Sequence, residues 1–508
     1  MSSKVLSAAT LGLTSHLVEV EADTHSGAHI FSIVGLPDAA VKESRDRVDS
    51  AVKNSGFRPP HRCGHITVNL APADIKKEGP LYDLPIALGF ILATKQLRAE
   101  IGNRLFIGEL SLNGAIRPVN GVLPIAIMAK EKNVTEIIVP EKNAKEAAIV
   151  EGLAVIPASN LKELIFHLTG EKKIDPEPPQ DLSKVFEPQK YVADMAYIKG
   201  QEYAKRALEV AAAGGHNVLL SGPPGSGKTL LARTFPSIMP PLTFPEALEI
   251  TKIFSIAGKL SRGISLISER PYRAPHHSAS AVSLVGGGTF PRPGEISLSH
   301  RGVLFLDEFP EFSRNVLENL RQPLEDGMIS VSRAQATLSF PARFTLIAAM
   351  NPCPCGNATD PEKLCSCTPA GIVKYQRKIS GPILDRIDIH AEVPRMRFEK
   401  LAETKVGEES ASVRKRVTTA RKKQRERFQN IDGIITNSEM QNLHIKKFCP
   451  LGEKEMALLR QAVDSLHLSA RAFHRIIKIA RTIADLADSE NIEVPHLAEA
   501  IQYRQRQI

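Results

Sequence analysis

The stretch Val218-Leu-Leu-Ser-Gly-Pro-Pro-Gly-Ser-Gly-Lys228-Thr229 decides the fold class of the central part of this chain. An apolar strand leads into a glycine-rich turn with the pattern G-x-x-x-x-G-K-[ST], and a helix-forming run follows. Glycines let backbone N–H groups close around phosphate oxygens, at a helix N-terminus whose dipole favours anions. The stretch therefore predicts a phosphate-binding loop in an α/β unit rather than a chance glycine-rich turn.

The pattern assigns a role to each position of the loop. Lys228 is expected to reach the β- and γ-phosphates, and the Thr229 hydroxyl is expected to ligate Mg²⁺. ATP and Mg²⁺ are therefore the expected cofactors. The predicted nucleotide-binding residues are Gly222, Pro223, Pro224, Gly225, Ser226, Gly227, Lys228 and Thr229.

Two acidic residues follow a second apolar strand, Val303-Leu-Phe-Leu306, in the same region. Adjacent carboxylates at the end of a buried strand are costly unless a cation or water occupies them. We expect Asp307 to hold Mg²⁺ through its shell and Glu308 to activate the attacking water.

Three polar residues further along the chain are candidates for contact with phosphate. Asn351 ends a third strand and either contacts the γ-phosphate or lytic water, or makes a simple turn before Pro352. Arg386 and Arg471 are either surface residues or catalytic arginines, because arginine stabilises charge on a transferring phosphoryl group.

A chain of 508 residues is too long for one ordinary domain. A charged stretch with four prolines near residue 175 predicts an extended linker between two α/β regions. Strands are expected at 66–70, 136–140, 216–221, 302–306 and 344–349, and helices at 84–97, 140–150 and from Ser469 to Ala487. The expected domains are 1–170 (α/β), 171–190 (linker), 191–393 (P-loop core, a parallel sheet flanked by helices) and 394–508 (helical lid).

The net charge of +9 is unevenly distributed. Residues 1–190 hold 22 basic and 23 acidic side chains, and the rest of the chain holds 43 and 33. The run from Arg414 to Arg427 contains eight basic residues and one acid. On a helix it either forms a solvated face or contacts phosphates or an acidic partner.

Cysteine usage and hydropathy favour a cytoplasmic protein. Six cysteines in a large chain fit a reducing compartment, and neither a secretory signal nor a membrane-spanning stretch is visible. The pairs Cys353/Cys355 and Cys365/Cys367 either bind a structural Zn²⁺ or remain four reduced thiols. Adjacent His276 and His277 favour structural hydrogen bonding over metal binding.

The order of these motifs over residues 191–508 resembles that of the AAA+ ATPases. More narrowly, the chain resembles the magnesium-chelatase-like ComM/YifB family. The stretches that carry this resemblance are Ile198-Lys-Gly-Gln201, Tyr272-Arg-Ala-Pro-His-His-Ser278, Asn351-Pro-Cys-Pro-Cys-Gly356 and Ile379-Ser-Gly-Pro-Ile-Leu-Asp-Arg-Ile-Asp388.

The resemblance implies residue roles. Gln201 would lie beside the nucleotide, Asn351 would be the sensor-1 residue, Arg386 the arginine finger acting on a neighbouring subunit, and Arg471 the sensor-2 arginine. An insert over residues 329–340 would form a β-hairpin pointing into the pore of a homohexamer, with Val331, Arg333 and Ala334 near its tip. The candidate DNA contacts are Arg333, Arg414, Lys415, Arg421 and Lys422.

The resemblance also implies a function. The family's proposed role is ATP-driven unwinding and branch migration of single-stranded, forked or branched DNA during natural transformation and recombination, with recombination proteins as partners. A magnesium-chelatase-type motor that drives a protein or metal-insertion partner shares the same ATPase signature and is the alternative.

Residues 1–170 resemble the proteolytic domain of Lon through Glu78-Gly-Pro80, Gly108-Glu-Leu-Ser-Leu-Asn-Gly-Ala-Ile-Arg-Pro118 and Gly121. The positions of Lon's nucleophilic serine and its lysine are occupied here by Leu81 and Leu123. A hydrolase of this type needs both the hydroxyl and the amine. The sequence therefore predicts a domain without proteolytic activity.

Overall fold

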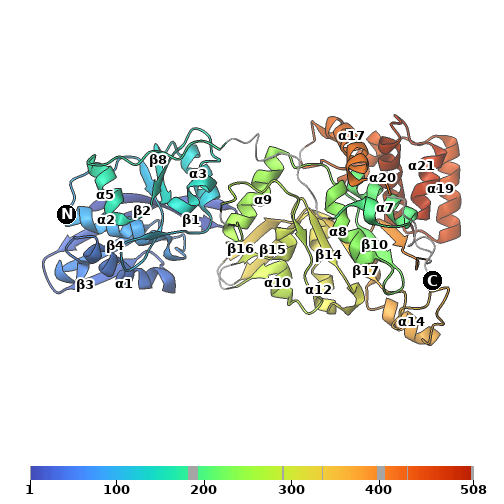
Figure 1. Ribbon diagram of the computed structural model, residues 1–508, viewed down its shortest axis with the longest axis horizontal. Coiled ribbons are helices and arrows are strands. Elements are labelled where there is room, and N and C mark those ends of the chain that lie inside the picture. Colours follow the sequence, from blue (N-terminus) through green and yellow to red (C-terminus); the bar gives the residue numbers. More distant parts are fainter. Residues whose placement is uncertain are drawn as a thin grey trace. The chain divides into compact units, whose positions relative to one another are not determined.

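The computed structural model describes residues 2–180, 193–261, 263–288, 291–333, 336–396, 407–431 and 433–504. The chain divides into two compact units, coloured along the sequence in Figure 1. Unit 1 comprises Met1–Phe186 together with Phe244–Ile267, and unit 2 comprises Glu187–Thr243 together with Ser268–Ile508.

Unit 1 is built on a seven-stranded mixed sheet in the order β3-β4-β2-β1-β5-β8-β9. β1 to β2 and β2 to β4 are antiparallel, and the remaining neighbours are parallel. The strands are β1 (Ser3–Leu11), β2 (Thr14–His25), β3 (Ile30–Val34), β4 (His65–Ala71), β5 (Arg104–Phe106), β8 (Glu136–Pro140) and β9 (Ala154–Ala158), with β6 (Glu109–Leu110) and β7 (Ile116–Arg117) forming a separate hairpin. The helices of residues 1–180 are α1 (Ala39–Asn54), α2 (Asp83–Ala93), α3 (Val122–Glu131), α4 (Ala144–Ala147) and α5 (Leu161–Thr169).

The strands predicted at 66–70 and 136–140 are confirmed, whereas two helices are shorter than predicted. α2 ends at Ala93, and Lys95 adopts a left-handed backbone with φ of 58° that stops the helix. The helix predicted at 140–150 is a 3₁₀ turn followed by the four-residue α4. The Asn143 side chain bonds both the N–H and the C=O of Val119 at 3.0 Å, which holds this turn against the neighbouring loop.

The two positions that correspond to the Lon dyad are both buried in unit 1. Leu81, in a 3₁₀ turn after Gly79, is 6% exposed, and Leu123, in the first turn of α3, is fully buried. The left-handed glycines Gly79 and Gly121 precede them, with φ of 78° at each. The turns are present, but the side chains that follow are aliphatic and packed.

The segment Phe244–Ile267, which the sequence prediction placed in the P-loop core, belongs to unit 1. It begins with α9 (Phe244–Ile256). The Ser255 hydroxyl donates to Glu146 Oε1 at 2.5 Å, and the N–H of Gly121 donates to the Ser255 carbonyl at 3.2 Å. These bonds join elements more than one hundred residues apart, so local sequence patterns did not reveal them.

Unit 2 contains a five-stranded parallel sheet in the order β11-β14-β17-β10-β18. Its strands are β11 (Tyr272–Arg273), β14 (Val303–Leu306), β17 (Thr345–Met350), β10 (Val218–Ser221) and β18 (Ile389–Glu392). β10, β14 and β17 are almost completely buried, as expected for a parallel sheet covered on both faces. α7 (Glu202–Gly214) and α8 (Lys228–Ile238) pack with these strands in one hydrophobic core (Figure 1).

The C-terminal part of unit 2 is helical, as predicted. Its helices are α17 (Ser410–Phe428), α18 (Asn442–Phe448), α19 (Glu453–Leu466), α20 (Ala470–Leu486) and α21 (Val494–Gln502). Ser469 caps α20 by accepting a hydrogen bond from the Ala472 N–H at 3.2 Å, which confirms the predicted N-cap. Ile476, Ile477, Ala480 and Ile483 form its buried face.

The predicted hairpin insert is present as β15 (Met328–Arg333) paired antiparallel with β16 (Ala336–Pro341). Ala334 and the side chain of Arg333 lie outside the described residues. The remaining short elements are α10 (Ala281–Val285), β12 (Gly286–Gly287), β13 (Arg292–Pro293), α11 (Glu295–Leu298), α12 (Arg314–Glu318), α13 (Arg321–Asp326), α14 (Pro369–Gln376) and α15 (Gly381–Leu384). Within the described ranges no helix is long and apolar enough to cross a bilayer.

Candidate active site

The phosphate-binding loop joins the carboxyl end of β10 to the first turn of α8. Gly222 fits because a Cβ there would lie 2.1 Å from the Val393 carbonyl oxygen, and Gly227 turns into the helix with φ of 95°. The Gly222 N–H donates to the Met350 carbonyl at 3.3 Å. The loop is therefore anchored to β17 and to the chain after β18, and its helix N-terminus is positioned for an anion.

Lys228 is folded back on this loop. Its Nζ donates to the carbonyls of Gly222 at 2.7 Å and Pro223 at 2.9 Å, and to Asn351 Oδ1 at 3.2 Å. Burial lowers the pKa of Lys228 to about 8, although Asp307 opposes the shift. The three hydrogen-bond partners of this ammonium group are uncharged oxygens. Phosphate oxygens bound in the loop would place negative charge next to it.

The predicted magnesium ligands lie together. The Thr229 hydroxyl donates to Asp307 Oδ2 at 2.7 Å, which joins the start of α8 to the end of β14. A hydroxyl and a carboxylate in contact are oxygen ligands of the kind that Mg²⁺ accepts when the nucleotide phosphates complete its shell. These residues fit the ion that the loop motif implies.

Two further predicted residues lie at the loop. Asn351 follows β17 and contacts Lys228 through its side chain, which places it at the phosphate end of the site. Gln201 is buried and donates from Nε2 to the Ser226 carbonyl at 3.2 Å and to the Pro394 carbonyl at 2.6 Å. Gln201 therefore links the loop, through the Ser226 carbonyl, to the chain after β18, through the Pro394 carbonyl.

Glu308 directly follows Asp307 and has a left-handed backbone with φ of 51°. Its Oε2 lies 3.0 Å from His277 Nδ1. The sequence prediction treated His277 only as a structural histidine and did not connect it with Glu308. The adjacent histidines in the stretch from Tyr272 to Ser278 were the available signal, but nothing in their spacing identifies a partner 31 residues away.

The two candidate catalytic arginines converge on one carboxylate, Glu325 at the end of α13. Arg386 is only 5% exposed, forms an ion pair with Glu325 and donates to the Pro382 carbonyl at 2.7 Å. Arg471 is well exposed, with its Nη2 3.8 Å from Glu325 Oε1. In the described part of the chain, the hydrogen bonds and ion pairs of these two arginines do not include the phosphate-binding loop. The sensor-2 role of Arg471 therefore stays a prediction.

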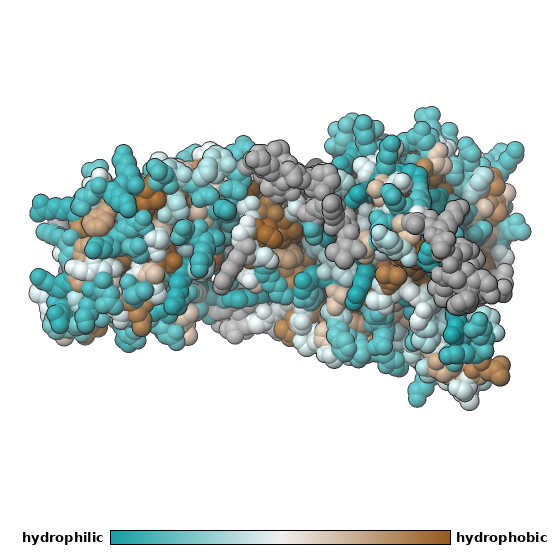
Figure 2. All heavy atoms as spheres, viewed as in Figure 1, coloured by the Kyte–Doolittle hydropathy of each residue, from teal (hydrophilic) through white to brown (hydrophobic). Residues whose placement is uncertain are grey.

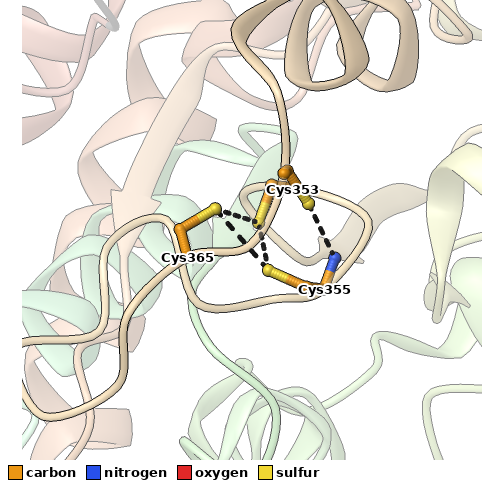
Figure 3. A group of neighbouring side chains, drawn as sticks. Cys353, Cys355 and Cys365 are labelled. Carbon is orange, nitrogen blue, oxygen red and sulfur yellow. Dashed lines mark hydrogen bonds between the residues drawn. The ribbon is translucent and has the colours of Figure 1, made fainter.

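The four cysteines after Asn351 come together, with all four sulfurs within 4.8 Å of one another. Cys353 Sγ lies 3.4 Å from that of Cys355 and 3.7 Å from that of Cys365, and the Cys355 and Cys365 sulfurs are 3.6 Å apart (Figure 3). The Cys355 N–H donates to Cys367 Sγ at 3.4 Å. All four are free thiols. Such a tetrathiolate cluster could bind Zn²⁺.

The predicted DNA-contacting helix is α17, and its apolar stripe is buried as expected. Lys415 and Lys422 are exposed, and Arg414 is half-buried. Arg421, in contrast, is 8% exposed and donates from Nε and Nη2 to the Ala212 carbonyl at 3.1 and 3.0 Å. The prediction that Arg421 contacts DNA is therefore wrong, because this guanidinium joins α17 to the end of α7.

Other basic residues of α17 are paired with acids of unit 2. Arg416 Nε lies 2.6 Å from Glu209, Arg427 bonds Asp485 at 2.5 Å, and Lys423 pairs with Asp488. The outward surface over α17 is nevertheless hydrophilic in Figure 2. The density of basic residues in the sequence therefore overstates the charge that α17 presents to a ligand.

Comparison with known proteins agrees with this arrangement. Residues 194–401 match the family described as magnesium chelatase, subunit ChlI, residues 20–143 match subunit ChlI of Mg-chelatase, and residues 407–504 match the C-terminal region of that subunit. Over 177 residues, or 32% of this chain and 22% of the relative, the chain is 28% identical to Lon protease 1 of Bacillus subtilis.

Two relatives match almost end to end. The chain is 45% identical over 504 residues to the competence protein ComM of Haemophilus influenzae, covering 98% of this chain and 97% of that protein. It is 42% identical over 499 residues to YifB of Escherichia coli, covering 98% and 96%. With the loop, the magnesium ligands and Asn351 assembled in one site, this chain belongs to the ComM/YifB family of magnesium-chelatase-like AAA+ ATPases.

Proposed function

We propose that this protein is an ATP-driven DNA motor that works as a homohexamer on single-stranded, forked or branched DNA, in natural transformation and recombination. The observation that carries the proposal is the pair of contacts Lys228–Asn351 and Thr229–Asp307 around the phosphate-binding loop, in a chain that matches a competence protein over 98% of its length. Lys228 binds the phosphates, Thr229 and Asp307 hold Mg²⁺, and Glu308 activates the attacking water.

The arrangement of the arginines supports an oligomer. Arg386 and Arg471 meet at Glu325 and have no hydrogen bond or ion pair with the described loop of their own chain. An arginine that stabilises the transferring phosphoryl group must contact it. We infer that Arg386 serves the nucleotide site of a neighbouring subunit, that Arg471 reaches nucleotide from the helical lid as the sensor-2 arginine, and that Glu325 holds both side chains when these contacts are not made.

Contacts with DNA are proposed at two places in unit 2. The β15–β16 hairpin carries Arg333, and α17 presents Lys415 and Lys422, with Arg414 beside them. Phosphate contacts of this kind give affinity without sequence specificity and are strongly salt-dependent. Such binding suits a motor that moves along DNA of any sequence.

The deciding experiment measures ATP hydrolysis of the full chain with and without single-stranded DNA, and unwinding of a fork and a four-way junction. We expect DNA to stimulate hydrolysis in the native protein, and both activities to disappear in Lys228→Ala. Glu308→Gln should bind ATP but not hydrolyse it. The DNA-motor proposal fails if DNA neither binds at low salt nor changes ATP turnover.

A chelatase-type motor is the second candidate, favoured by the three matches to magnesium-chelatase subunit families. In that case ATP hydrolysis would drive a protein partner that inserts a metal. The same assay separates the two, because a chelatase-type motor would respond to its porphyrin-carrying partner and not to DNA.

We also propose that the four cysteines bind one structural Zn²⁺. Zn–S bonds of about 2.3 Å in a tetrahedron require sulfur–sulfur distances of about 3.8 Å. The distances of 3.4, 3.6 and 3.7 Å between the Cys353, Cys355 and Cys365 sulfurs fit this requirement. The bound metal would pin the loop that follows Asn351. A Cβ on Gly356 would lie 2.6 Å from Pro224 Cδ, so this loop touches the phosphate-binding loop.

Elemental analysis of the dialysed protein tests the zinc site. We expect about one zinc per chain in the native protein and none in Cys355→Ser combined with Cys365→Ser. Cys449→Ser is the matched control, since Cys449 is a buried cysteine outside the cluster. A native chain that is active and free of metal would contradict the proposal.

A further inference from the structure

The contact between His277 and Glu308 is the feature of the ATPase site that its motifs do not explain. His277 Nδ1 lies 3.0 Å from Glu308 Oε2, within hydrogen-bonding distance. The Glu308 side chain is 58% exposed and sits on a left-handed backbone, so packing does not fix its orientation. The imidazole is therefore a candidate for the group that orients this carboxylate.

His277 is itself held in place by rings on two sides. Its ring centroid lies 4.0 Å from that of His276, and the Phe312 ring meets it edge-on at 6.4 Å. The segment is fixed further by Arg273, whose Nε lies 2.5 Å from Glu295 Oε2. A restrained imidazole next to an exposed carboxylate is the arrangement expected of a positioning group.

Glu308 directly follows Asp307 in the chain. Asp307 Oδ2 accepts a hydrogen bond from the Thr229 hydroxyl at 2.7 Å. The carboxylate that contacts His277 therefore belongs to the residue next to the predicted magnesium ligands.

We propose that His277 is a positioning residue for ATP hydrolysis, whose Nδ1–H orients the Glu308 carboxylate toward the attacking water. One carboxylate oxygen accepts from the imidazole, and the other remains available to accept a proton from water. A base oriented by a third group is a recurrent device in hydrolysis. The inference rests on the proposed role of Glu308 as water activator.

The test compares three single variants of the full chain by steady-state ATP hydrolysis. His277→Ala should lower kcat about tenfold with little change in KM, less than the roughly 10²–10⁴-fold that loss of a general base costs. His277→Asn should recover part of the rate, because the asparagine amide N–H occupies the position of Nδ1–H. His16→Ala, which removes an exposed histidine of β2 in unit 1, is the control and should change kcat less than about twofold.

Three further measurements separate positioning from misfolding. The Kd of an ATP analogue and the thermal unfolding midpoint should be unchanged in His277→Ala. In a Glu308→Ala background, His277→Ala should have no additional effect on the residual rate, since residues that act as a unit are not additive.

Contradictory results have distinct meanings. If kcat of His277→Ala is unchanged or higher, or if KM rises while kcat holds, His277 does not position Glu308 for catalysis. If Glu308→Gln still turns over ATP, the proposed role of Glu308 fails and this inference fails with it. An inactive Glu308→Gln beside a fully active His277→Ala would overturn only the role of His277.

Discussion

The sequence predicted phosphate contacts in two regions of unit 2, the nucleotide site and helix α17. The side chains of these two regions are arranged differently in the structure. At the nucleotide site Lys228, Thr229, Asp307 and Asn351 converge on one another. Along α17, Arg421 bonds the Ala212 carbonyl instead of facing solvent. A motif that includes backbone geometry specifies where its side chains meet, whereas a run of like charges specifies only a composition.

The largest effect is expected from a substitution of Asp307, a predicted magnesium ligand of the nucleotide site. Asp307→Asn removes the charge that would balance Mg²⁺, and metal stabilisation of the transferring phosphoryl group amounts to several kcal/mol, so ATP turnover should fall by about 10²-fold or more. Asp326→Asn, at an exposed acid of α13, is the control. Near-normal turnover in Asp307→Asn would remove this residue from the site.

The next largest effect is on the free energy of unfolding, and it distinguishes a buried basic residue of α17 from an exposed one. Arg421→Ala leaves the Ala212 carbonyl without its charged donor and should lower the free energy of unfolding by about 2–4 kcal/mol. Lys422→Ala, its exposed neighbour, should leave denaturant unfolding unchanged. Equal stability of the two variants would show that the buried guanidinium contributes nothing.

A smaller effect concerns affinity for DNA. Lys415→Ala combined with Lys422→Ala should reduce the slope of log affinity against log salt by about 1.4 for single-stranded DNA, since each phosphate contact contributes about 0.7. Lys142→Ala combined with Lys145→Ala removes two exposed lysines of unit 1 as the control. A slope unchanged in the α17 variant would leave this helix as a solvated surface.

The smallest effect is a pH dependence of ATP binding. Lys228 has a pKa lowered to about 8 by burial, below its ordinary value of 10.5, so the free protein loses this charge as the pH rises through 8. Bound phosphates favour the ammonium, and ATP binding above this pH therefore takes up a proton.

Between pH 7.5 and 8.5 the Kd for ATP should rise about threefold, measured by calorimetry in buffers of different ionisation enthalpy. Lys228→Arg should abolish this dependence, because arginine stays protonated. A Kd in the native chain that does not vary over this interval would contradict the lowered pKa.

Sequence reasoning performed best where a prediction depended on short-range spacing. The loop before Lys228, the strand before Asp307 and the N-cap Ser469 are each specified by neighbouring residues, and the structure places all of them as predicted. The aliphatic replacements Leu81 and Leu123 were likewise readable, and both side chains are buried.

The sequence by itself determined the parallel-sheet ATPase core, the composition of its nucleotide site and the lack of the Lon dyad. The tertiary structure decided that Phe244–Ile267 joins unit 1, that Arg421 is internal, that Glu325 collects two arginines and that His277 meets Glu308. The physical reason is the separation along the chain of the residues that interact. Secondary structure and loop motifs follow from residues a few positions apart, whereas burial and the choice of a charge partner depend on segments that only folding brings together.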